Sequence, residues 1–296
     1  MLRRLASTYK ALFCTDIHQI NYFSGPVIVD DDDPVFSADR IALLNRANVL
    51  AVVTTTDQLR DRFSQAGLRK PCHVIPSGVH FSQLNCAKAM QIRSKLEKSD
   101  RDIVVGFSVP YLFTDQDREV KAPEAKLRSI SFLAAVMEKV WENNPYIHLW
   151  LVGEPSRSVR AFSKNHPQVR LLGYVPHMEV LNYYTNFDIA VYPRLVDLSG
   201  RHSIKLVEFM AAGLPIVSTP VAESFHVKQS GAGIIVEGLE AFAKAILYLQ
   251  AYPEMRTNLG NKGKEYGAQF DWDYVGHRYE REVLAVYTNS VFANED

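Results

Sequence analysis

Lys205 and Glu208 lie three residues apart in the segment Ser203-Ile-Lys-Leu-Val-Glu-Phe-Met-Ala-Ala-Gly213. This pattern is typical of a short helix that begins after Ser203 and stops at Gly213. Residues i and i+3 share one helix face, so the ammonium and the carboxylate lie side by side. Two interpretations stay open. One is an exposed ion pair worth well under ~1 kcal/mol. The other is a site where Lys205 and the free N–H groups of the first turn hold a diphosphate, while Glu208 accepts hydrogen bonds from ribose hydroxyls.

Apolar runs at 187–193 and 216–218 flank this helix and indicate two strands. In open α/β sheets, ligands bind at the carboxyl ends of the strands. The loop after the first run carries Arg194, Arg201 and His202. We expect these side chains either to contact a phosphate or a sugar, or to contact solvent alone.

Four consecutive aspartates occupy Asp30–Asp33. Carboxylates of this kind bind Mg²⁺ or Mn²⁺ in many proteins. Adjacent side chains of an extended chain point in opposite directions, however, so the four carboxylates do not all converge. We therefore favour a solvated loop before Pro34 and predict no metal site.

The composition excludes several classes of protein. The chain has 296 residues, with 33 basic and 33 acidic side chains and no net charge, so nothing favours a nucleic-acid partner. No apolar run approaches the ~20 residues of a membrane-spanning helix, and the first residues lack the apolar core of a secretory signal. Three cysteines without metal-ligand spacing suit a reducing, cytoplasmic location. The basic and aromatic stretch Met1–Tyr9 leaves a peripheral contact with the inner membrane face open.

Short apolar runs alternate with longer helical patterns, which predicts an α/β protein with a parallel sheet and helices on both faces. Expected strands are 11–14, 27–29, 49–54, 73–75, 103–107, 148–152, 169–172, 189–192, 216–218 and 233–236. Expected helices are 38–46, 56–66, 126–142, 157–165, 178–185, 203–212, 239–249, 253–268 and 272–292. A polar helical stretch at 86–100 separates two groups of elements and indicates a domain boundary near residue 100.

Five short motifs follow one another in this order: Arg46–Leu59, Val74–Val79, Leu149–Glu154, Leu172–Pro176 and Val207–Val217. Together they resemble the motifs of the retaining GT-B glycosyltransferases of the glycosyl transferases group 1 type. This resemblance implies two Rossmann-like domains, of which the first is incomplete. Residues 1–100 would form a partial acceptor-side domain and 101–275 the nucleotide-sugar-binding domain, while the helix of 276–296 would pack back on the first domain.

The same resemblance implies a reaction and a set of residues. The reaction is transfer of a sugar from a nucleotide diphosphate-sugar to an unidentified acceptor (a glycan, a lipid-linked molecule or a small molecule), with retention and without metal or other cofactor. Glu208 matches the second glutamate of the family motif E-x7-E and would hold the ribose. Lys205 would stabilise the leaving diphosphate, together with Lys126 or, as an alternative, Lys121. The remaining expected donor-binding residues are Ser203, Leu206, Tyr174, Val175, Ser108, Arg194, Asp197 and His202.

Two departures from the family pattern stand out. Gly200 occupies the position of the first glutamate of E-x7-E, so we expect Asp197 to replace that sugar contact. The first domain is also short for this fold, which leaves open a fragment, a mis-started reading frame, half of a split enzyme or a degenerate member. A non-catalytic binding protein, with a protein partner on the exposed apolar surface, and an epimerase of the same fold are therefore alternative functions.

Overall fold

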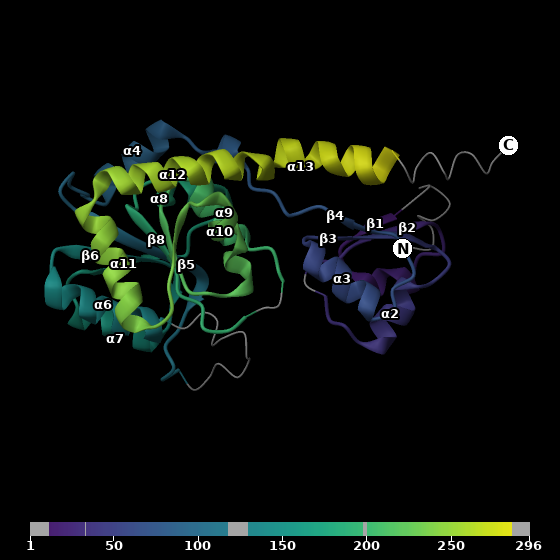
Figure 1. Cartoon of the computed structure of the whole chain (residues 1–296), viewed down its shortest axis with the longest axis horizontal. Coiled ribbons are helices and arrows are strands. Elements are labelled where there is room, and N and C mark those ends of the chain that lie inside the picture. The colour runs from purple at the N-terminus through teal and green to yellow at the C-terminus, as the bar shows by residue number, and fades with distance from the viewer. Residues whose placement is uncertain (1–11, 33, 118–129, 198–199, 286–296) are drawn as a thin grey trace. The chain divides into compact units, whose positions relative to one another are not determined.

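The computed structural model describes residues 12–32, 34–117, 130–197 and 200–285, and the chain divides into two compact units (Figure 1). Unit 1 comprises Met1–Gly78, Ser199–His202 and Gln269–Asp296. Unit 2 comprises Val79–Leu198 and Ser203–Ala268. The division after Gly78 falls before the expected boundary near residue 100, so the polar helical stretch belongs to unit 2.

Unit 1 contains a four-stranded parallel sheet in the order β1-β2-β3-β4. Its strands are β1 (Leu12–Cys14), β2 (Val27–Asp30), β3 (Val49–Thr54) and β4 (Cys72–Val74). Its helices are η1 (Ile17–Asn21), α2 (Ala38–Leu44), α3 (Asp57–Gln65) and α13 (Trp272–Tyr279), which continues as one π-helical turn over Glu280–Leu284. Ser37 and Thr56 accept hydrogen bonds from Arg40 N and Leu59 N, and these N-caps begin α2 and α3.

The C-terminal helix completes the core of unit 1. Val275 and Val283 are fully buried and pack with Ile28, Val53 and Ile75. Arg278 donates to the Val74 carbonyl at 2.8 Å, and the Tyr279 hydroxyl donates to Asp30 Oδ2 at 3.0 Å. Residues from opposite ends of the chain therefore build one hydrophobic core.

Unit 2 contains a six-stranded parallel sheet in the order β10-β9-β8-β5-β6-β7. Its strands are β5 (Ile103–Leu112), β6 (Ile147–Pro155), β7 (Val169–Gly173), β8 (Ile189–Tyr192), β9 (Ile216–Ser218) and β10 (Gly233–Ile235). Its helices are η2 (Phe81–Gln83), α4 (Cys86–Lys95), α6 (Ser131–Asn143), α7 (Arg157–Asn165), α8 (His177–Tyr184), α9 (Ile204–Ala211), η3 (Ala222–Ser224), α10 (Phe225–Ser230), α11 (Leu239–Ala251) and α12 (Pro253–Gly267), and η4 spans Ala268–Phe270.

Both faces of this sheet are covered, as a parallel sheet requires. Helices α6 and α11 supply buried side chains such as Met137 and Phe242 to a core that includes Val105 and Val191. On the other face Phe187 approaches Gly106 so closely that a Cβ at position 106 would lie 1.9 Å from the Phe187 ring. The structure confirms the predicted α/β architecture with parallel sheets.

The segment that follows Gly78 is tied to the rest of unit 2 by partly buried polar contacts. Asn85 N donates to Asn182 Oδ1 at 2.7 Å, and Asn182 Nδ2 donates to the Gln83 carbonyl at 3.0 Å. Lys98, only 4% exposed, forms an ion pair with Asp188 at 2.8 Å. These contacts join the residues on either side of α4 to α8 and to Asp188, which directly precedes β8, in keeping with the assignment of this segment to unit 2.

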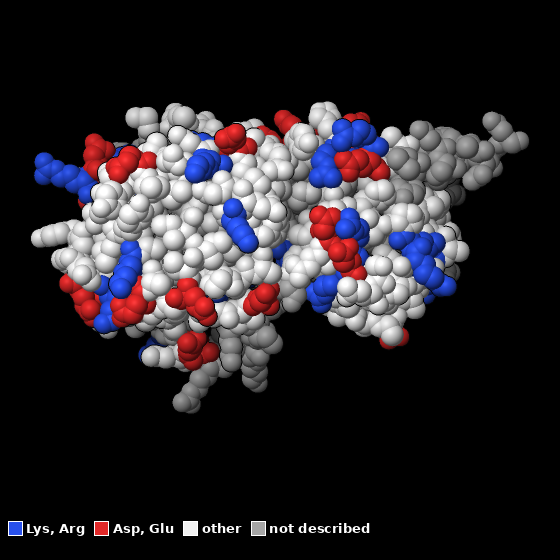
Figure 2. Space-filling model, viewed as in Figure 1, with Lys and Arg blue, Asp and Glu red and all other residues white. Residues whose placement is uncertain are grey.

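Several predicted elements differ in extent. Strand β5 runs on to Leu112 through a register shift after Ser108, beyond the expected end at 107. Helix α6 begins at Ser131, and the expected start at 126 lies outside the described residues. Among the described residues, no helix combines the length and hydrophobicity that crossing a bilayer needs. Figure 2 shows acidic and basic side chains interspersed over the visible face, in keeping with the zero net charge.

Candidate functional site

The helix predicted around Lys205 and Glu208 is α9, and it begins and ends where the sequence indicates. The Ser203 hydroxyl accepts from Leu206 N at 3.5 Å, which caps the first turn. Gly213, with φ of +74°, follows the last turn in the left-handed conformation that glycine adopts readily. Leu206 in this turn is fully buried, so the start of the helix is anchored in the interior of unit 2.

Lys205 and Glu208 form an ion pair of 2.6 Å between Nζ and Oε2. The pair is not the exposed surface contact considered above, because the Glu208 side chain is only 2% exposed and that of Lys205 is 26% exposed. The other carboxylate oxygen lies 3.4 Å from Nδ1 of His177, an exposed residue at the start of α8. Glu208 therefore faces Lys205 and His177 rather than open solvent.

A second partner of Lys205 is the hydroxyl of Tyr184, which lies 2.6 Å from Nζ. Burial lowers the pKa of Lys205, but Tyr184 and Glu208 more than offset this effect and hold the pKa above its ordinary value. Burial also raises the pKa of Tyr184 to about 12, so its hydroxyl keeps its proton. That hydroxyl donates to Ser108 Oγ at 2.6 Å. A continuous hydrogen-bonded chain thus runs from Glu208 through Lys205 and Tyr184 to Ser108.

Lys205 and Ser108 both open into a small cavity of about 140 Å³ at the carboxyl ends of β5 and β8. Its lining consists of Phe107, Ser108, Val109, Pro110, Val191, Tyr192, Pro193, Arg194 and Lys205. All of its polar side chains carry hydrogen-bond donors, and two of them are cations. The cavity is therefore suited to a ligand that is anionic and rich in acceptors.

Tyr192 lines this cavity, and its hydroxyl is buried. The residue is 3% exposed, and its hydroxyl makes no hydrogen bond of normal geometry within the described residues, although the nearby Ser203 hydroxyl lowers its pKa. Burial raises the pKa of Tyr192 to about 12, against the opposing effects of Arg194 and Ser203. A buried donor without a partner is costly, and a bound acceptor would remove that cost.

Arg194 lies at the cavity wall with its guanidinium 3.7 Å from the carboxylate of Glu223, which is 1% exposed. The same guanidinium lies 5.0 Å from the ring centroid of Tyr192. The Arg194 backbone is fixed as well, because its carbonyl accepts a hydrogen bond from the Thr219 hydroxyl. The second cation of the cavity is thus held in place by β9 and the turn that follows it.

The remaining sequence-predicted residues lie outside the cavity. Tyr174 is 66% exposed and Val175 is buried, in the connection between β7 and α8. Asp197 is exposed. Lys121 and Lys126 lie outside the described residues. Of the sequence-predicted residues, only Ser108, Arg194 and Lys205 line the cavity among those that the structure describes. Ser203, Leu206 and Glu208 lie on α9 or at its cap, next to Lys205. Tyr174, Val175, Asp197 and His202 belong neither to the lining nor to this helix.

His202 belongs to unit 1 rather than to the cavity of unit 2. Its Nε2 lies 3.0 Å from the Ser77 carbonyl, which can only accept, so Nε2 carries the proton. Its ring packs against Phe270. Burial lowers the pKa of His202 to about 4, which keeps the imidazole neutral near pH 7. The proximity of residues 202 and 203 in sequence does not place both at one site.

The three described aspartates of the acidic segment have separate partners. Arg40 binds Asp31 through two hydrogen bonds of 2.7 and 3.1 Å. Ser77 donates to Asp32, and Tyr279 donates to Asp30. Position 33 lies outside the described residues. Within the described ranges, no group of three or more His, Cys, Asp or Glu side chains has the arrangement of a metal site.

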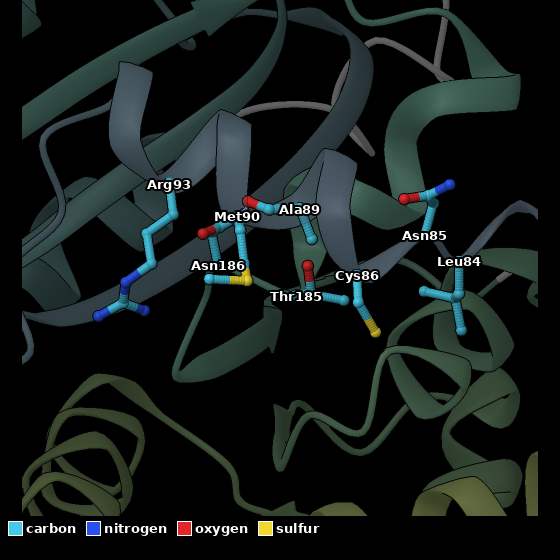
Figure 3. A pocket seen from close by; sticks show the side chains of 8 residues that line it. All are labelled: Leu84, Asn85, Cys86, Ala89, Met90, Arg93, Thr185 and Asn186. Atoms are coloured by element: carbon cyan, nitrogen blue, oxygen red, sulfur yellow. Dashed lines mark hydrogen bonds between the residues drawn. The ribbon is translucent and has the colours of Figure 1, made fainter.

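Two other hollows differ chemically from the cavity at Lys205. One of about 270 Å³ lies between α4 and the end of α8, as Figure 3 shows, and its single charged lining residue, Arg93, forms an ion pair with Asp100. The other, of about 540 Å³, lies in unit 1 between η1 and α2, and its lining mixes Arg40 and Arg46 with Asp39. Neither hollow combines two cations with a polar lining made only of hydrogen-bond donors.

Sequence reasoning missed Tyr184, Tyr192 and His177 as members of the site. The stretch 181–187 indicates aromatic helix packing, and Tyr184 does pack against Phe209 with a centroid distance of 5.0 Å. Its hydroxyl at Lys205 has no local signal, because its partners Ser108 and Lys205 are 76 and 21 residues away. Only the crossing of β5, α8 and α9 brings them together.

Comparisons with known proteins found one family model and several solved structures that resemble this chain. Residues 123–251 match the family model described as Glycosyl transferases group 1, whereas no curated protein shows significant sequence similarity to the chain. Sucrose-phosphate synthase from Thermosynechococcus elongatus is 18% identical, with a TM-score of 0.71 over 97% of this chain and 78% of that one. HepE from Anabaena, in complex with UDP, is 16% identical, with a TM-score of 0.70 over 96% and 82%. A glycosyltransferase from Rickettsia africae is 13% identical, with a TM-score of 0.73 over 99% and 81%.

These structural neighbours share the GT-B fold with this chain, and at such low identities they establish the fold alone. The family match over 123–251 covers β6 to β10 and helices α6 to α11, which include α9 and its ion pair. That match indicates a glycosyltransferase.

Proposed function

We propose that this protein transfers a sugar from a nucleoside diphosphate-sugar, held in unit 2, to an acceptor held by unit 1, with retention at the anomeric carbon and without a metal ion or other cofactor. The observation that carries the proposal is the convergence of Ser108, Tyr192, Arg194 and Lys205 on one cavity beside the N-terminus of α9. Positive charge and oriented donors at the carboxyl edge of a parallel sheet are the features that bind a diphosphate.

The reaction requires stabilisation of a leaving group. When the bond between the anomeric carbon and the diphosphate oxygen breaks, negative charge grows on that oxygen. Lys205 and Arg194 supply charge, and the hydroxyls of Ser108 and Tyr192 with the first-turn N–H groups of α9 supply oriented dipoles. Donors fixed before the reaction stabilise such charge without reorganisation. Lys126 or Lys121 remains a proposed additional cation.

The assignment of the nucleoside part follows from the same arrangement. Glu208 would accept from ribose hydroxyls, which requires the exposed imidazole of His177 to move aside from the carboxylate. Tyr174 and Val175 would frame the base next to it, and Asp197 would contact the transferred sugar. HepE, a structural neighbour, has been solved with UDP and with UDP-glucose, so uridine is the first base to test here.

Calorimetry with UDP, GDP, ADP and their monophosphates tests the proposal. We expect at least one diphosphate to bind at least about tenfold more tightly than its monophosphate, since the second phosphate reaches the cavity donors. Lys205→Ala should remove this preference, whereas Lys139→Ala, at an exposed ion pair on α6, should keep it. Equal affinity for mono- and diphosphates would contradict the proposal.

Turnover separates catalysis from binding alone. Release of UDP from UDP-sugars, measured with and without a chelator, should proceed at the same rate in both conditions if no metal takes part. Binding without any release of diphosphate, across a panel of sugar donors and acceptors, would instead favour a non-catalytic binding protein.

A further inference from the structure

The Tyr184 hydroxyl lies between two residues of the cavity without lining it. It is 2.6 Å from Lys205 Nζ on one side and 2.6 Å from Ser108 Oγ on the other. Tyr184 itself is fully buried, so no ligand can touch it directly. Any effect of this hydroxyl on a ligand must pass through Lys205 or Ser108.

The direction of each hydrogen bond follows from the chemistry of the groups. An ammonium only donates, so Tyr184 must accept from Lys205. The tyrosine hydroxyl has a single hydrogen, and that hydrogen goes to Ser108 Oγ. Ser108 therefore acts as acceptor in this bond, and its own hydrogen remains to be donated.

The Ser108 hydrogen has no protein acceptor among the residues that the structure describes, and Ser108 lines the cavity. The lone pairs that face Tyr184 are occupied, so the hydrogen points away from Tyr184. A cationic donor at the start of a hydrogen-bonded chain polarises each later member and strengthens the last donor.

We propose that Tyr184 is a positioning residue. It transmits the polarising effect of the Lys205 ammonium to Ser108, and it orients the Ser108 hydroxyl so that its hydrogen points toward a phosphate oxygen of the bound diphosphate. This inference rests on the proposed function, because it needs a diphosphate in the cavity. Without Tyr184, the Ser108 hydroxyl would be free to rotate and to accept rather than donate.

The alternative is that Tyr184 only fills space. Its ring packs against Phe209 and Phe187, with centroid distances of 5.0 and 5.5 Å. Tyr184→Phe keeps this ring and removes the hydroxyl alone, so it separates the two roles. Tyr183→Phe is the matched control on the same helix, since the Tyr183 hydroxyl makes no hydrogen bond to any part of the chain that the structure describes.

A double-mutant cycle with UDP as the probe tests the inference. Ser108→Ala and Tyr184→Phe should each weaken UDP binding about tenfold, as expected for loss of a hydrogen bond to a charged group. In the Ser108→Ala background, Tyr184→Phe should cost about threefold or less, because the group that it orients is gone. Tyr183→Phe should leave the affinity unchanged. Circular dichroism and thermal unfolding verify that all variants are folded.

The measurements distinguish a failure of this inference from a failure of the proposed function. If the wild type binds UDP, and the two substitutions have multiplicative effects or Tyr184→Phe has none, Tyr184 does not act through Ser108 and the inference is wrong. If Tyr184→Phe lowers only the unfolding temperature and leaves UDP affinity unchanged, the hydroxyl stabilises the fold without acting on the ligand, and the inference is wrong. If the wild type binds none of UDP, GDP and ADP, the proposed function itself fails, whatever the variants do.

Discussion

The Lys205 ammonium lies 2.6 Å from the Glu208 carboxylate one helical turn away, and the Glu208 side chain is 2% exposed. The same i,i+3 spacing occurs in the Lys139–Glu142 pair of α6, at 3.2 Å, but there the side chains are 41% and 61% exposed. The two pairs therefore have the same spacing but differ in burial, since the carboxylate is buried in the first and exposed in the second.

Loss of the buried pair should destabilise unit 2. Glu208→Ala leaves Lys205 with Tyr184 as its described partner in a poorly solvated position, so we expect a loss of about 2–3 kcal/mol in the free energy of unfolding. Glu142→Ala, at the exposed pair, should cost less than about 0.5 kcal/mol. Urea unfolding of both variants measures the difference. Equal small losses would mean that burial adds nothing to the Lys205–Glu208 interaction.

Removal of the Tyr192 hydroxyl should weaken UDP binding without lowering the stability of the protein in the absence of ligand. Tyr192→Phe deletes a buried donor that lacks a partner in the described structure, so the unfolding free energy without ligand should change by less than about 1 kcal/mol or rise. Binding of UDP should weaken because one donor of the cavity is lost. Thermal unfolding with and without UDP checks both effects. An unchanged shift of the unfolding temperature by UDP would exclude Tyr192 from the site.

Asp30 should make unit 1 less stable as the pH rises. Burial, reinforced by the neighbouring Asp32, raises the pKa of Asp30 from its ordinary value of 3.8 to about 7. Between these values the folded state binds more protons than the unfolded state, so the unfolding free energy decreases as the pH rises from about 4 to about 7. Asp30→Asn keeps an acceptor for Tyr279 and should remove this contribution.

The matched control for Asp30 is Asp39→Asn, at an exposed position of α2. Urea unfolding at pH 4 to 8 measures the difference between each variant and the wild type. For Asp30→Asn this difference should grow with pH in favour of the variant, and Asp39→Asn shows how much of that growth any Asp-to-Asn change on this unit produces. A constant difference in both would contradict the raised pKa.

His202 should make unit 1 less stable as the pH falls, which is opposite to the effect of Asp30, over an overlapping pH range. Burial lowers its pKa to about 4, whereas the unfolded chain binds a proton near pH 6.5. The stabilisation is fully present above about pH 6.5 and is lost as the pH falls toward about 4. NMR titration of the ring should show a neutral imidazole, protonated on Nε2, down to about pH 5. A ring that titrates near pH 6.5 would show that the hydrogen bond to Ser77 does not exclude water.

Short sequence patterns were enough to predict helix α9 and the parallel α/β architecture. The spacing of Lys205 and Glu208, the cap at Ser203 and the stop at Gly213 depend on a few consecutive residues, and the structure places α9 accordingly. The alternation of strand and helix patterns likewise predicted parallel sheets, because a strand and its crossover helix are each encoded by a short periodic segment.

Only the tertiary structure decided which of these groups meet. Glu208 is buried because α8 covers α9, Ser108 receives the Tyr184 hydroxyl across 76 residues, and His202 turns to Ser77 in unit 1 although Ser203 caps a helix of unit 2. A sequence pattern records spacing along one element. Burial and hydrogen-bond direction depend on which elements cross, and that is set by the packing of whole sheets and helices.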